Sequence, residues 1–175
     1  MHYIARNPRR ALAALLTTMV AAAAVVGSGA DFSSHSANPA NTFSSGTLLQ
    51  SNSRSGVAVV TGSNLKPGDV RSGEVTITNT GSLAGTFKLA ESNAANGFGA
   101  GDMTLKIEDV SGSNPVSVYS GDIGKVPAGG INLGSYAAGE ARTYRLTATF
   151  AKESPNSDQA KSAKADYEWD AVPTS

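Results

Sequence analysis

The stretch Thr143–Phe150, TYRLTATF, decides the fold class. Its apolar residues recur at every second position, so that Tyr144, Leu146, Ala148 and Phe150 share one face. Successive side chains of a β-strand point to opposite faces of the sheet, and such alternation is typical of a strand with one face in a core and one in water. The stretch therefore predicts a β-strand whose large apolar side chains belong to the core.

The last long stretch, Ala163–Ala171, alternates in the same way. Tyr167 and Trp169 lie on its apolar face, and acidic residues lie on the other. The same period of two recurs in four further candidate strands, which are Val75–Ile77, Phe87–Leu89, Met103–Ile107 and Val116–Val118. Two shorter candidates, Leu48–Gln50 and Val57–Thr61, have less regular patterns. Short strands at close spacing predict an all-β fold, an antiparallel jelly roll or β-sandwich of about eight strands.

Turn residues separate these candidate strands. In Lys66–Asp69 the order Pro67-Gly68-Asp69 suits a type II turn, since proline fixes φ and glycine accepts a positive φ. Asn79 and Gly81 mark a second turn. An N-terminal helix is expected within residues 1–30; after it, the stretch 154–164 is the sole helical candidate and is long enough for no more than a short turn. We therefore assign residues 46–175 to one jelly-roll domain.

The first thirty residues have the pattern of a secretory signal peptide. Three arginines, all within residues 1–10, precede the uncharged run Ala11–Val26, and small residues follow. The best cleavage point lies between Ala30 and Asp31. The alternative is a membrane anchor, but the run has 16 residues, whereas a spanning helix needs about 20. We expect a secreted, extracellular or cell-surface protein with no membrane attachment after removal of the signal.

Residues 31–45 differ from both neighbours because serine, asparagine and alanine dominate them. Phe32 and Phe43 are their sole large apolar residues. This composition is typical of a flexible arm. Two interpretations remain open at this point, a donor strand for another subunit and a disordered spacer.

The charge balance and the absence of cysteine exclude several classes of protein. Residues 31–175 carry 11 Lys and Arg residues against 14 Asp and Glu residues. This net negative charge does not favour binding to nucleic acid, which requires a positively charged surface. With no cysteine in the chain, neither a disulfide framework nor a thiolate metal site can form.

Residues that carry catalytic or metal chemistry are scarce after the signal. His35 is the one histidine there, and it lies in the polar arm, where we expect it to be solvated. Asp166, Glu168 and Asp170 share a strand face, but same-face neighbours stand nearly 7 Å apart, too far to close on one calcium ion unaided. We expect no catalytic residue, no metal site and no cofactor.

Tyr167 and Trp169 allow two interpretations. An exposed pair of aromatic rings could stack on sugars, whereas rings that alternate with charged residues along a strand belong to a core. The alternation favours the core.

Three segments, in this order, resemble the TasA/camelysin family of secreted matrix proteins. They are FSSGTL at Phe43–Leu48, the pair NLKPGD at Asn64–Asp69 and NTGSL at Asn79–Leu83, and the closing AKADYEWDAV at Ala163–Val172. The signal that ends before Asp31-Phe32 is similar to those that the family's dedicated signal peptidase removes.

The resemblance implies a jelly-roll subunit of extracellular biofilm-matrix fibres. In such fibres an N-terminal strand of one subunit completes the sheet of the next. The resemblance implies that the donor strand of this chain contains Phe32 and Phe43. Self-association is the implied partnership, with other matrix or cell-surface proteins as further partners. Two alternatives stay open: a cell-surface binding module that does not polymerise, and a metallopeptidase, as camelysin has been classed.

Overall fold

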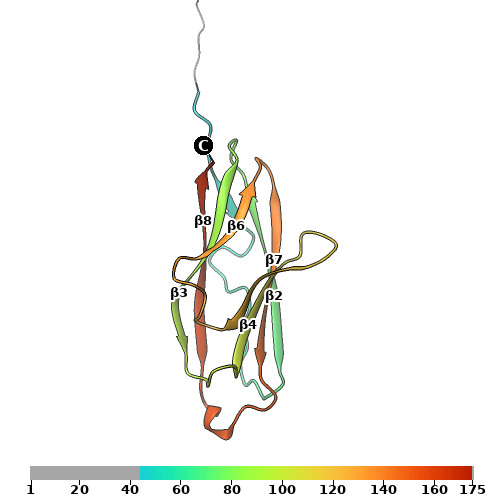
Figure 1. Cartoon of the computed structure of the whole chain (residues 1–175), viewed down its shortest axis with the longest axis vertical. Helices are drawn as coiled ribbons and strands as arrows, with labels where there is room; N and C mark the ends of the chain where they lie inside the picture. Colours follow the sequence, from blue (N-terminus) through green and yellow to red (C-terminus); the bar gives the residue numbers. More distant parts are fainter. Residues whose placement is uncertain (1–43, 175) are drawn as a thin grey trace, which may run out of the picture. The chain divides into compact units, whose positions relative to one another are not determined.

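Eight β-strands form the part of the chain that the structure, a computed structural model, describes, namely residues 44–174 (Figure 1). The strands are β1 Gln50–Asn52, β2 Val70–Asn79, β3 Gly85–Asn96, β4 Met103–Asp109, β5 Val116–Asp122, β6 Ile131–Tyr136, β7 Ala141–Phe150 and β8 Ala163–Pro173. A single 3₁₀ turn, η1 Asn156–Asp158, precedes β8. These residues belong to one compact unit, Ser44–Ser175.

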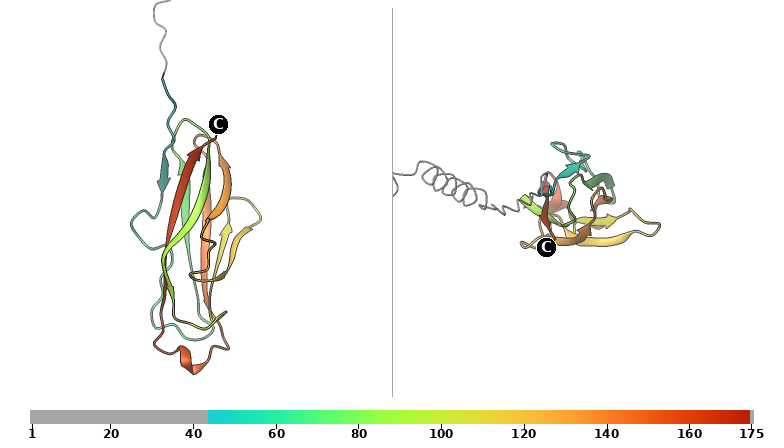
Figure 2. Two further views of the ribbon diagram at one scale, coloured as in Figure 1. Left: turned by 60° about the vertical axis from the view of Figure 1, so that its left-hand side comes forward. Right: turned by 90° about the horizontal axis from the view of Figure 1, so that it is seen from above.

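The strands pair in two antiparallel sheets that face each other (Figure 2). The larger sheet has the order β1-β2-β7-β4-β5, and the smaller sheet has the order β6-β3-β8. The predicted β-sandwich of about eight strands is confirmed.

The core lies between the two sheets and consists of the inward residues of alternating strands. Phe87 of β3 stacks on Tyr136 of β6 with ring centroids 4.1 Å apart, and Tyr144 of β7 lies 5.0 Å from Trp169 of β8. Each aromatic pair of this kind stabilises a fold by about 0.5–1.5 kcal/mol beyond its buried area. The other fully buried members are aliphatic and include Val75, Ile77, Leu89, Leu105, Ile107 and Leu146.

Two turns have the residues that their geometry requires. Gly68 has φ of +92°, and the amide of Asp69 donates to the carbonyl of Lys66 at 3.0 Å, as in a type II turn with Pro67 at its second position. At the end of β2, the side-chain Oδ1 of the fully buried Asn79 accepts a hydrogen bond from the amide of Gly81 at 3.0 Å.

The close approach of another chain segment explains the glycine in this second turn. A Cβ on Gly81 would lie 2.3 Å from the carbonyl oxygen of Thr47. The turn and the chain before β1 therefore pack backbone against backbone.

The structure corrects four details of the strand assignment. The strand expected at Leu48–Gln50 lies instead at Gln50–Asn52. Val57–Thr61 is not a strand, because tight turns at 52–57 bend the chain there (Ser55 N to Asn52 O, 3.2 Å). Val116 is 63% exposed, since it begins the edge strand β5. The strand β6 was not predicted, because Gly134, with φ of +85°, interrupts its alternation.

Several sequence predictions concern residues 1–43, which lie outside the described part. They are the signal peptide with its Ala30–Asp31 cleavage point, the arm with Phe32 and Phe43, and His35. Within residues 44–174, no helix has the length and apolar character needed to cross a membrane.

Candidate functional site: the open edge of strand β8

The strand order leaves one position of a jelly roll empty. In a regular eight-stranded jelly roll the first strand pairs with the last. Here β2-β7-β4-β5 and β6-β3-β8 have the regular order, but β1 pairs with β2 and not with β8. Within residues 44–174, β8 therefore pairs with β3 alone, and its other edge is open.

One side chain reaches the open edge of β8. Gln50 of β1 donates a hydrogen bond from Nε2 to the backbone carbonyl of Trp169. Among the backbone hydrogen bonds found in the described loops, none reaches this edge. Unpaired N–H and C=O groups along a strand edge are a template for pairing with another chain.

A groove follows the open edge, with β8 as one wall and residues 52–65 as the other. Its upper part has a volume of about 340 Å³ and is lined by Asn52, Arg54, Val57, Val59, Tyr167 and Trp169, among others. Its lower part, of about 760 Å³, is larger and more apolar. Lining residues of the lower part include Val60, Phe98, Met103, Leu105, Phe150 and Tyr167.

The wall opposite β8 is the segment 57–65, which has few hydrogen bonds. The amide of Val57 donates to the carbonyl of Arg54 at 3.0 Å, and no backbone hydrogen bond was found for residues 58–65. Val59 and Val60 nevertheless pack against the core. The groove therefore has an apolar floor and backbone groups without bonds on both walls.

The electrostatics of the groove favour a neutral tyrosine. Tyr167 is half-buried, and burial raises the pKa of its hydroxyl, with the charge of Glu91 as a second cause. At the lower end the buried Asp158 carboxylate is paired with Lys161 at 3.2 Å. The groove thus offers apolar contact and backbone hydrogen bonds, and charged residues of both signs, such as Arg54, Lys164 and Asp166, are also part of its lining.

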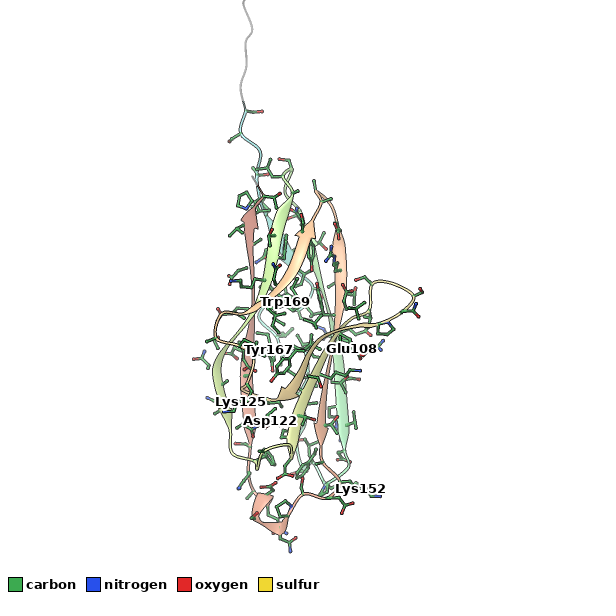
Figure 3. The ribbon with its side chains drawn as sticks, viewed as in Figure 1. Glu108, Asp122, Lys125, Lys152, Tyr167 and Trp169 are labelled. Atoms are coloured by element: carbon green, nitrogen blue, oxygen red, sulfur yellow. The ribbon has the colours of Figure 1, made fainter. Side chains whose placement is uncertain are left out.

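The aromatic residues of β8 lie at this groove (Figure 3). Trp169 is 6% exposed and packs on Tyr144, so it does not form an open platform for sugar stacking. Tyr167 is half-buried. The other predicted core residues, Tyr144, Leu146 and Phe150, are buried on β7.

The acidic residues of β8 alternate with its inward residues, and one of them, Asp166, also lines the upper part of the groove. Asp166 accepts a hydrogen bond from Asn93 at 2.9 Å, and Glu168 accepts one from Ser92. All three acidic residues are exposed. They form a solvated surface beside β3.

Sequence reasoning missed the groove itself. Nothing in the local sequence shows that Gln50 covers β8 or that segment 57–65 faces it, because both depend on where β1 pairs. One signal was available: Pro173 ends β8, and proline within a sheet is confined to edge strands, strand starts and bulges.

The fold and the groove define a jelly-roll β-sandwich with a vacant position beside its last strand. A family profile described as camelysin metallo-endopeptidase matches residues 8–95, half of the chain. The chain belongs to this family, and the TasA/camelysin resemblance is confirmed. A search of curated proteins found no match.

The family's description implies a metal, which we tested against the donor residues. Among residues 44–174 there is no group of three or more His, Asp or Glu residues that could hold a metal ion. Both histidines, His2 and His35, lie outside the described part. The donor set of the described residues therefore does not fit a metal of the usual kind.

Proposed function

We propose that this protein is a secreted structural subunit that assembles into extracellular matrix fibres by donating its N-terminal arm to the next subunit. The observation that carries the proposal is the vacant jelly-roll position beside β8, with its groove. A strand placed there would satisfy the backbone groups of the open edge and cover the apolar floor.

The occupant is the arm of a second copy, beginning at Asp31. It directly precedes the described part of the chain, contains two large apolar residues and no charge beyond Asp31. Main-chain hydrogen bonds supply most of the affinity in strand addition, so a Ser- and Asn-rich segment can serve as donor.

The placement of the chain's ends favours a filament over a closed pair. Thr47 and Thr174 both bond to the β2–β3 loop, so the described chain begins and ends near that loop. The lower, larger part of the groove lies beside η1, at the opposite end of the sandwich (Figure 1). An arm that leaves one end and enters the other end of the next subunit gives head-to-tail assembly.

Deletion of Asp31–Phe43 from the secreted protein tests this function. We expect a folded monomer with an unchanged β circular-dichroism spectrum that forms no fibres on concentration, whereas the full mature chain forms them in negative-stain micrographs. A second variant, with the arm replaced by Gly and Ser residues at the same length, controls for spacing and should not polymerise. Fibres from either variant contradict arm donation.

If the full mature chain itself forms no fibres, the groove serves a binding module that does not polymerise. Tight binding of a cell-surface polymer by monomeric protein would support that alternative.

A peptidase activity is the second candidate, and the family description alone favours it. We propose that the protein is not an enzyme, in keeping with the donor set described above. Stoichiometric zinc in purified protein, with casein hydrolysis that a chelator abolishes, would overturn this.

A further inference from the structure

We infer that the arm enters the groove with its even-numbered residues toward the core, so that Phe32 is the anchor and Phe43 faces solvent. This inference rests on the proposed arm donation and adds its register. It is argued from the hydrogen-bonding direction of β8 and from the order of residues in the arm.

The two phenylalanines cannot both face the core from one regular strand. They stand eleven positions apart, an odd separation. Because side chains alternate between faces with a period of two, an odd separation places them on opposite faces. Only one of the two phenylalanines can therefore be the anchor. The direction of the backbone hydrogen bonds of β8 determines which one.

The open edge of β8 presents the backbone groups of its inward residues. Trp169 points into the core, and its carbonyl accepts the hydrogen bond from Gln50 on the open side. In an antiparallel strand the N–H and C=O of one residue point to the same side. Tyr167 and Ala171, two positions away on either side, therefore also direct their N–H and C=O to the groove.

Pro173 agrees with this direction. It is two positions beyond Ala171, so the side on which it lacks an N–H is the open edge, and its pairing with Gly85 of β3 loses no donor.

The same geometry restricts the arm. An inserted strand pairs its inward residues with the inward residues of β8, and those inward residues must donate their N–H groups to β8. Pro39 has no N–H, so it cannot be one of them without losing a hydrogen bond. Pro39 therefore faces outward, and with it every odd-numbered residue of the strand, Phe43 included.

The remaining arm residues favour the same register. Outward placement of odd residues keeps His35 in water, whereas the opposite register would bury an imidazole with no identified partner. The even positions between Phe32 and Phe43 hold small or neutral side chains, which are Ser34, Ser36, Asn38, Ala40 and Thr42.

The direction of insertion places Phe32 in the upper groove. An arm antiparallel to β8 enters beside η1 and ends, at its N-terminus, toward the other end of the sandwich. Tyr167, Trp169 and Val59 line the upper groove, and their apolar surfaces can pack against a phenyl ring. The ligand of this site is thus the aromatic side chain near the N-terminus of the donor subunit's mature arm.

Cysteine labelling of two neighbouring arm residues tests the register directly. The chain has no cysteine, so Ser33→Cys and Ser34→Cys each introduce a single thiol with little change of size. Both variants are made in the full secreted protein and treated with a maleimide as monomer and as fibre. We expect equal labelling in the monomer and, in the fibre, labelling of Ser34→Cys slower than that of Ser33→Cys by about tenfold or more.

A matched pair of alanine variants supplies a second readout. Phe32→Ala should raise the protein concentration needed for fibres, whereas Phe43→Ala should leave it within about twofold, as expected for an exposed side chain. Faster labelling at Ser34→Cys, equal labelling of the two thiols in the fibre, or a larger effect of Phe43→Ala overturns the inference. If the register is wrong but deletion of the arm still abolishes fibres, the proposed arm donation remains valid. If deletion of the arm leaves fibre formation intact, both the register and the arm donation are wrong.

Discussion

The edges of β2 and β8 are covered differently, although both strands contribute to the lining of the groove, β2 through Arg71. The β2 edge pairs with β1 and then with residues of the following turn: Ser53 exchanges hydrogen bonds with Thr76, and Arg54 donates to the carbonyl of Glu74 at 3.3 Å. The β8 edge receives one bond, from the Gln50 side chain. Natural sheets usually protect such edges, and this difference between the two edges is the basis of the proposed arm donation.

The largest expected effect is on the core beneath the open edge. Trp169→Ala should lower the free energy of unfolding by about 3–5 kcal/mol, because a buried indole leaves a cavity. Denaturant unfolding measures this. A loss below about 1 kcal/mol would mean that Trp169 is not part of the core, and that the open edge of β8 does not lie beside an apolar floor.

Proline variants separate the two edges of β8 itself. Asp170→Pro removes an N–H that faces β3 and should destabilise the monomer by about 1–3 kcal/mol, because it breaks a hydrogen bond of the ladder with Lys88. Ala171→Pro removes an N–H that faces the groove, so it should cost the monomer less while weakening fibre formation. Equal loss of monomer stability in the two variants contradicts the assigned directions.

A glycine on β2 tests how closely the groove wall is held. A Cβ on Gly73 would lie 1.8 Å from the carbonyl oxygen of Val59, so Gly73→Ala must displace segment 57–65. We expect a loss of about 1–3 kcal/mol, as for overpacking in a core. Gly112→Ala, where no atom lies within 4 Å, is the control and should change stability by less than about 0.5 kcal/mol.

The smallest effect concerns pH. Burial raises the pKa of the Tyr167 hydroxyl in the folded protein. The contribution of this group to the free energy of unfolding is therefore fully present below the ordinary tyrosine pKa of about 10 and declines as pH rises above it. Tyr167→Phe should reduce this decline by at most about 1.4 kcal/mol per pH unit. Denaturant unfolding at a series of pH values measures this. If the free energy of unfolding falls with pH equally steeply above pH 10 in the unmodified protein and in Tyr167→Phe, the pKa of Tyr167 is not raised by the fold.

The sequence predicted the sandwich because apolar alternation in β7 and β8 is a local property that each strand carries. It predicted the turn at Gly68 for the same reason, since proline and glycine act on their own dihedral angles. It could not predict that β1 pairs with β2, because the three residues Gln50–Asn52 carry no pattern that selects a partner. The groove depends on that pairing, and so it emerged from the structure alone.

Residue-resolved amide exchange in the fibre tests the central claim most directly. Arm donation predicts that the amides of Tyr167, Trp169 and Ala171, which face the groove, exchange much more slowly in the fibre than in the monomer. The amides of Glu168 and Asp170, already directed toward β3, should change little. Unchanged exchange at the three groove-facing amides, in protein that has formed fibres, would contradict pairing at β8 and place the assembly contact elsewhere.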